Sequence, residues 1–180
     1  MLVGGNSSRM GRNKALLPYH GTTLGQSVAD VVRAATGTAA LVGDRLYDGL
    51  SEIGFVPDLY PGEGPLGGIL SALRSSTADW NLIVACDMPE LELALLRQLL
   101  DAADSCGGDA LVPAGPSGRL EPLCAAYHRK ALGCLEAAFA RGVRKMATAL
   151  EEIDTVIWPV PELSCFQNVN TPEEWAPYER

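Results

Sequence analysis

The 180-residue sequence has few of the residues that usually mark metal, redox or membrane chemistry. Its two histidines, His20 and His128, lie far apart, and its five cysteines include no C-x-x-C pair. This pattern gives no zinc site and no histidine-based nucleophile pair, and it suits reduced thiols in a cytoplasm. No apolar run approaches a membrane span, and the start lacks the layout of a secretory signal. We therefore expect a cytoplasmic protein without a membrane partner.

Positive charge is also scarce. Fourteen Lys and Arg face 22 Asp and Glu, a formal net charge of -8, which argues against a nucleic-acid or membrane-surface binder. An acidic chain that handles phosphates must concentrate its positive charge locally. The opening loop does so, because it contains Arg9, Arg12 and Lys14.

The segment 2–14 reads LVGGNSSRMGRNK and is rich in glycine, with Gly4, Gly5 and Gly11. Glycines let backbone N–H groups approach an anion closely, and Arg and Lys supply the countercharge. The segment is therefore interpreted as a phosphate-binding loop. It is no P-loop, because Ala15 follows the lysine, and its glycine spacing does not match G-x-G-x-x-G.

Short apolar runs alternate with helical patterns along the whole chain, which is typical of an α/β protein with a mainly parallel sheet. We expect one three-layer α/β/α domain over residues 1–180 with a mixed sheet, in which 110–112 and 123–127 are antiparallel neighbours. The predicted strands are 38–42, 55–56, 80–85, 110–112, 123–127 and 155–158. The predicted helices are 24–35, 46–53, 66–74, 91–103, 132–139 and 145–152, with a further helix capped by Thr171.

Chemically active side chains fall where strands of this sheet would end. Asp87 follows a buried strand directly and is the best candidate for a Mg²⁺ ligand, although it could also cap the next helix. Asp58 follows another strand, in a loop rich in Pro and Gly. Asn168 and Asn170 would project to one side of an extended segment and reach a polar ligand, or cap a local turn.

Five segments carry a family pattern: 4–14, 64–68 (GPLGG), 86–89 (CDMP), 121–127 (EPLCAAY) and 168–174 (NVNTPEE). The glycines of 64–68 open a helix and could admit a ligand, although tight helix–sheet packing is the simpler interpretation. Taken together, these segments resemble the molybdenum cofactor guanylyltransferases (MobA), within the nucleotidyltransferases of a nucleotide-diphospho-sugar transferase-like, Rossmann-like fold. The matching segments span nearly the whole chain in the right order, and the last two look specific to the guanylyltransferases.

The resemblance implies that the GMP moiety of GTP is joined to the terminal phosphate of Mo-molybdopterin, with release of pyrophosphate and dependence on Mg²⁺. Arg9 and Lys14 would hold the triphosphate, and Mg²⁺ on Asp87 would bridge phosphate oxygens. No protein nucleophile is needed. Transient contacts with molybdoenzymes or with cofactor-delivery proteins are further expected partners.

The resemblance also implies where the substrates bind. The backbone of Leu2, Val3 and the paired glycines Gly4 and Gly5 would contact the nucleotide. Asp58 would lie near the base or ribose, where a carboxylate can accept from guanine N1–H and the 2-amino group. Asn168 and Asn170 would face the pterin.

The chain departs from the family pattern in three places. Val3 stands where alanine is usual, and Asn13 stands where aspartate is common; both look tolerable. Only Met1 and Leu2 stand where the family has several apolar residues before the glycine loop. Either the true start lies upstream or the first strand is stunted, and of these we expect a truncated start and hence a truncated first strand.

Two other functions remain open at this point. Cytidylyl transfer to the same pterin, or nucleotidyl transfer to a sugar phosphate by another MobA-like nucleotidyltransferase, is disfavoured by the segment 168–170. A non-catalytic nucleotide-binding assembly protein would be favoured if Lys14→Ala left function intact.

Overall fold

The computed structural model describes residues 1–3, 13–43, 50, 53–162 and 164–179. Its largest sheet has the strand order β5-β7-β6-β8, and a parallel pair, β3 and β4, lies beside it. β7 is antiparallel to both of its neighbours, whereas β6 and β8 are parallel. The strands are β3 (Ala40–Gly43), β4 (Gly54–Pro57), β5 (Trp80–Val84), β6 (Ala110–Ala114), β7 (Cys124–His128) and β8 (Thr155–Pro159).

Residues 1–3 join the two sheets. Leu2 forms parallel bridges to Val42 in β3 and to Ala85, the residue just after β5. On one side the Leu2 N–H donates to the Val84 carbonyl at 2.8 Å, and on the other the Val3 N–H donates to the Val42 carbonyl at 2.8 Å. The short segment before the loop therefore takes the central place that a first strand would hold, which gives the order β4-β3-(1–3)-β5-β7-β6-β8.

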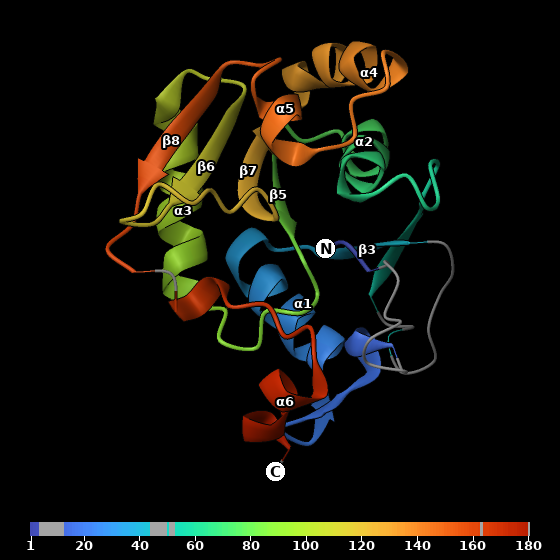
Figure 1. Ribbon diagram of the computed structural model, residues 1–180, viewed down its shortest axis with the longest axis vertical. Helices are drawn as coiled ribbons and strands as arrows, with labels where there is room; N and C mark the ends of the chain where they lie inside the picture. Colours follow the sequence, from blue (N-terminus) through green and yellow to red (C-terminus); the bar gives the residue numbers. More distant parts are fainter. Residues whose placement is uncertain (4–12, 44–49, 51–52, 163, 180) are drawn as a thin grey trace.

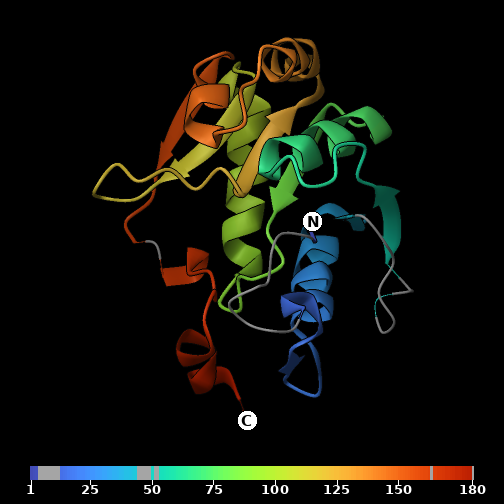
Figure 2. The ribbon, with the colours of Figure 1, turned by 45° about the vertical axis from the view of Figure 1, so that its right-hand side comes forward.

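The helices form two layers, one on each face of the sheet (Figures 1 and 2). One layer contains α1 and α3, and the other contains α2, α4 and α5. Their bounds are α1 (Leu24–Thr36), α2 (Pro65–Ser75), α3 (Leu93–Cys106), α4 (Leu132–Ala140) and α5 (Met146–Leu150). No helix in the described part of the chain is long and apolar enough to cross a membrane.

Alternation along the strands explains why both faces are covered. Ile83 packs into the core under α2 and α4, whereas the next residue, Val84, packs into the core under α1. In β7, Ala125 packs into the core under α2 and α4, whereas Cys124 packs into the core under α1. Successive side chains of a strand point to opposite faces, so a strand that is apolar throughout needs helices on both sides.

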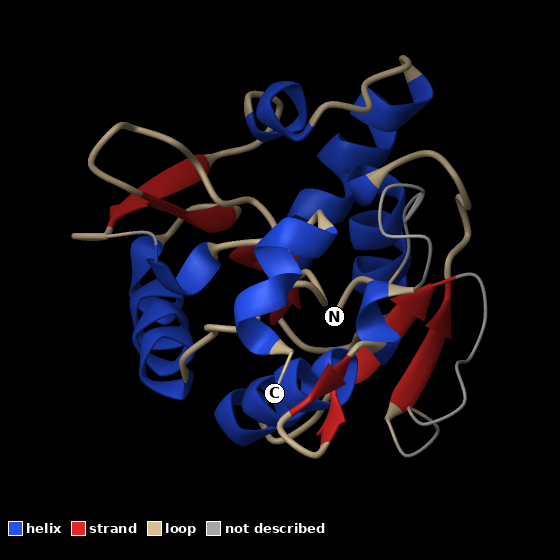
Figure 3. Cartoon of the chain, turned by 60° about the horizontal axis from the view of Figure 1, so that its bottom comes forward, coloured by secondary structure: helices blue, strands red, loops and turns tan. Residues whose placement is uncertain are grey.

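The C-terminal segment packs against a hairpin that the sequence analysis missed. The hairpin consists of β1 (Pro18–Tyr19) and β2 (Thr22–Thr23), joined by His20 and Gly21. Both turn residues have positive φ, 46° and 80°, as a two-residue type I′ turn requires. α6 (Pro172–Trp175) lies beside this hairpin (Figure 3). The ring centroids of Tyr19 and Trp175 are 6.0 Å apart.

The predicted three-layer α/β class is confirmed, and so is the antiparallel pairing of β6 with β7. Thr171 caps α6 as expected, with a complete capping box to Glu174. The helix predicted from Leu91 starts at Leu93 instead. Most of the helix predicted over 46–53 lies outside the described residues.

Candidate active site

Lys14 is held in place by its own local structure. It begins a short 3₁₀ helix (Lys14–Leu16), and the Asn13 side chain caps that helix by accepting from the Ala15 N–H at 2.9 Å. Ala15 and Leu17 are fully buried, so the turn is fixed to the core. Asn13 thus performs the capping role for which aspartate is equally suited.

The Lys14 ammonium contacts side chains from two distant segments. Its Nζ donates to Asp87 Oδ2 at 2.8 Å and to Asn170 Oδ1 at 2.7 Å. The Lys14 and Asp87 side chains are only 17% and 15% exposed. The geometry therefore brings together three of the predicted site residues, from the beginning, middle and end of the chain.

Asp87 and Asn170 are fixed by the backbone around them. The Asp87 carbonyl accepts from the Val169 N–H at 2.9 Å, which attaches the segment 168–170 to the end of β5. The Asn170 N–H donates to Glu174 Oε2 at 2.6 Å, so the capping box of α6 also holds Asn170. Asp87 does not cap α3, whose N-cap is Glu92.

Asp58 lies in a different part of the sheet, directly after β4. Its Oδ1 accepts from the Tyr60 N–H at 2.9 Å and from the Ser71 hydroxyl at 3.0 Å. These bonds orient the carboxylate, but none of its described contacts joins it to Lys14 or Asp87. Gly4, Gly5 and Arg9, which were predicted to bind the nucleotide, lie outside the described residues.

The glycines that open α2 serve packing. A Cβ on Gly68 would lie 3.1 Å from Leu2 Cδ2, and one on Gly67 would lie 2.9 Å from Tyr60 Cβ. Small residues therefore let α2 approach residues 1–3 and the loop after β4. Leu2 and Val3 are thereby positioned from both the sheet and the helix layer.

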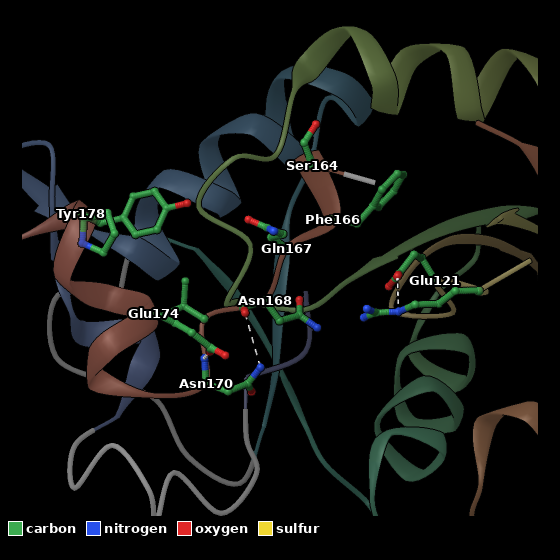
Figure 4. A pocket seen from close by; sticks show the side chains of 11 residues that line it. Glu121, Ser164, Phe166, Gln167, Asn168, Asn170, Glu174 and Tyr178 are labelled. Carbon is green, nitrogen blue, oxygen red and sulfur yellow. Dashed lines mark hydrogen bonds and ion pairs between the residues drawn. The ribbon is translucent and has the colours of Figure 1, made fainter. Parts of the chain in front are cut away.

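A cavity of about 730 Å³ opens next to Asn170 (Figure 4). Asn168 and Asn170 line it, as do two groups that the sequence analysis assigned no role, Arg119 and Glu121. Glu121 belongs to the EPLCAAY segment and stands just before a buried strand. This position in the sequence could have identified Glu121 as a candidate site residue. Ser164, Gln167, Glu174 and Tyr178 complete the cavity's polar lining.

The described residues contain no group of three or more His, Cys, Asp or Glu that could enclose a metal ion. Nucleotide-dependent enzymes do not need such a cage, because Mg²⁺ is held by one or two carboxylates together with substrate phosphates. Asp87 suits this arrangement. Lys14 engages its Oδ2, and no hydrogen bond from the described part of the chain reaches Oδ1.

Fold and site together define a class. A mixed α/β sheet with a lysine, a carboxylate and an amide in contact beside a large cavity fits a nucleotidyltransferase with a nucleotide-diphospho-sugar transferase-like fold.

The comparisons with known proteins agree with this class. The MobA-like NTP transferase domain matches residues 1–156. A probable molybdenum cofactor guanylyltransferase of a Nostoc species is 32% identical, with 98% of this chain and 87% of the relative covered. The molybdenum cofactor guanylyltransferase of Vibrio parahaemolyticus is also 32% identical, with 99% and 92% covered. The chain therefore belongs to the MobA-like NTP transferase family.

A solved structure supports the same conclusion. Molybdopterin-guanine dinucleotide biosynthesis protein A from Archaeoglobus fulgidus superposes with a TM-score of 0.81 at 31% identity, covering 99% of this chain and 94% of the other.

Proposed function

We propose that the chain is a molybdenum cofactor guanylyltransferase, which transfers GMP from GTP to Mo-molybdopterin. A terminal phosphate oxygen of the pterin attacks the α-phosphorus of GTP, the α–β bond breaks, and pyrophosphate leaves. The observation that carries nucleotidyl transfer is the contact of Lys14 with Asp87 and Asn170. The choice of GTP and molybdopterin rests on the names of the relatives.

Lys14 would neutralise charge on the phosphates. Both substrates are anionic, so the main barrier is bringing their charges together in line. Lys14 is shielded from water and fixed by Asn13, which strengthens its attraction for a phosphate. Arg9 and the glycine loop would add donors, as the resemblance implies.

Asp87 would hold Mg²⁺ through its carboxylate. Bound there, the ion would supply Lewis-acid stabilisation of charge on the phosphate oxygens. Lys14 pairs with Oδ2 of the same carboxylate, so the ammonium would stand beside the ion and next to the phosphates.

The nucleotide and the pterin would occupy the two halves of the sheet edge. Leu2, Val3, Gly4 and Gly5 would contact GTP, with Asp58 beyond them near the guanine. Asn168 and Asn170 would face the pterin, because both line the cavity on the other side of Asp87.

We also propose that the protein acts in the cytoplasm and meets molybdoenzymes or cofactor-delivery proteins transiently. The five cysteines are free, which suits a reducing compartment.

A turnover assay tests the proposal. The protein is incubated with Mo-molybdopterin, Mg²⁺ and GTP, CTP, ATP or UTP in separate reactions, and the product is identified by mass. We expect the guanine dinucleotide from GTP and its loss when EDTA removes the metal. A product from CTP alone would identify a cytidylyltransferase, and nucleotide binding without any product would favour a non-catalytic assembly protein.

A further inference from the structure

The cavity beside Asn170 contains a buried carboxylate that the proposed chemistry leaves unused. Glu121 is 5% exposed and lines the cavity at the start of the chain segment that enters β7. Its backbone is fixed, because its N–H donates to the Pro113 carbonyl at 2.9 Å and its carbonyl accepts from the Cys124 N–H at 3.1 Å. A carboxylate in such a rigid position is suited to recognition.

Glu121 is only partly satisfied by protein groups. Its Oε1 lies 3.0 Å from Arg119 Nε, and Arg119 is itself largely exposed. No hydrogen bond from the described part of the chain reaches Oε2. Burial raises the pKa of Glu121 and the Arg119 charge only partly opposes this rise, as expected for a carboxylate with too few donors.

A second acceptor in the same cavity also lacks a partner. Asn168 Oδ1 is buried and has no hydrogen bond in the described part of the chain. Figure 4 shows the Asn168 side chain extending towards Glu121. A buried acceptor without a donor is costly. Asn168 Oδ1 is such an acceptor, and it shares the cavity with a buried carboxylate whose described side-chain partner is Arg119, so we expect a ligand to supply donors here.

The ligand must present neighbouring N–H groups to a carboxylate. A 2-aminopyrimidin-4-one ring does so, because its ring N–H and its exocyclic amino group lie side by side and match the two oxygens of a carboxylate. The buried Phe166 adds an apolar wall suited to a flat ring.

We propose that Glu121 reads the aminopyrimidinone edge of the acceptor's pterin, with Asn168 Oδ1 accepting a further N–H. This assignment rests on the proposed function and makes Glu121 a specificity-determining residue for the acceptor.

Guanine has the same hydrogen-bonding edge as the pterin. The location of Glu121 in the sheet must therefore decide which of the two rings it contacts. Glu121 lies between β6 and β7, on the far side of Asp87 from residues 1–3 and from Asp58, which follows β4. The cavity also borders the 168–170 segment, whose Val169 N–H donates to the Asp87 carbonyl, whereas the Val3 N–H donates to Val42 in β3. The sheet order therefore assigns Glu121 to the acceptor and leaves Asp58 for the nucleotide.

Binding of two small probes tests the assignment without turnover. The probes are 6-hydroxymethylpterin and 6-hydroxymethyllumazine, whose 2-oxo group replaces the amino group and sets an oxygen against the carboxylate. Binding is measured by titration calorimetry or probe fluorescence. We expect the unaltered protein to prefer the pterin by about 10-fold or more, because a hydrogen bond to a charged group is at stake.

The variant Glu121→Gln should reduce this preference to about 2-fold, since an amide meets one of the two donors with its own N–H group. It should also raise the KM for Mo-molybdopterin about 10-fold while the KM for GTP stays unchanged. The control Glu162→Gln makes the same chemical change at an exposed glutamate that lines a different cavity, and it should alter neither quantity.

The outcomes separate this inference from the proposed function. No preference for pterin over lumazine in the unaltered protein, or a preference that survives Glu121→Gln, overturns the role of Glu121. A rise in the KM for GTP instead would assign Glu121 to guanine and equally overturns it. Failure of guanylyl transfer with an intact pterin preference would refute only the proposed reaction.

Discussion

At the scale of single residues, Lys14 is the side chain on which the proposed chemistry most depends. Lys14→Met keeps much of the buried stem and removes the charge, so we expect the rate of pyrophosphate release to fall about 100-fold or more. The assay is guanylyl transfer at saturating GTP and pterin. Lys130→Met is the matched control, because Lys130 is exposed and pairs with Asp109 at 3.3 Å away from the cavity. Unchanged turnover in Lys14→Met would contradict a catalytic role.

Asp58 gives a second prediction at this scale. Its carboxylate is oriented by Ser71 and the Tyr60 N–H, and among the described residues these hydrogen bonds reach Oδ1 alone. Asp58→Asn should lower the preference for GTP over ITP, which lacks the 2-amino group, by about 10-fold. The preference is measured as the ratio of kcat/KM values. If the ratio does not change, Asp58 does not contact the base edge, and its carboxylate serves the loop alone.

At the scale of elements, the packing of α1 against the Lys14–Leu16 turn fixes the position of Lys14. A Cβ on Gly25 would lie 2.9 Å from the Ala15 carbonyl oxygen, a backbone atom that cannot easily move. We expect Gly25→Ala to cost about 1–3 kcal/mol through overpacking, more than the gain of about 1 kcal/mol in helix propensity. Urea unfolding gives the change in stability, and kcat should fall because Lys14 shifts.

Gly133→Ala is the control for that prediction. Gly133 lies in α4 with nothing within 4 Å of an added Cβ, so the same substitution should stabilise the protein by about 0.5–1 kcal/mol. Similar effects at both glycines would mean that α1 does not press on the turn.

Some elements could be predicted from the sequence and others could not, depending on how local their signals are. Apolar residues at helical spacing located α1 to within a residue, because periodicity is a local signal. The β1–β2 hairpin was missed, because two-residue strands have no alternation to detect. The meeting of Lys14 with Asp87 followed from strand ends sharing one edge of a sheet. The bond from Lys14 to Asn170, and the pairing of Glu121 with Arg119, depend on loop paths that no local pattern encodes.

At the scale of the whole molecule, buried acidic groups in the sheet predict alkaline sensitivity. Burial, with the nearby Asp87 charge, raises the pKa of Cys86 from 9.0 to about 12, and burial also raises the pKa of Cys124 and Tyr127. Between these values the unfolded chain releases protons that the folded chain retains. Stability should therefore fall as pH rises from 9 towards 12.

The midpoint of urea unfolding at pH 7, 9 and 10.5 measures this effect. We expect the midpoint to fall between pH 9 and pH 10.5, and to fall less in Cys86→Ala, which removes one of the protons involved. A midpoint that stays level up to pH 10.5 in the unaltered protein would show that these groups are not buried in the folded state.

The position of residues 1–3 between β3 and β5 has a consequence for biosynthesis. This segment leaves the ribosome first among the residues described. Its hydrogen bond from the Leu2 N–H to the Val84 carbonyl, however, can form only after Val84 has been translated. In the nascent chain it can pair with β3 alone, and its other side stays open to mispairing. Complete assembly of the centre of the sheet is therefore expected only after Val84 has emerged, which makes chaperone protection of the early intermediate advantageous.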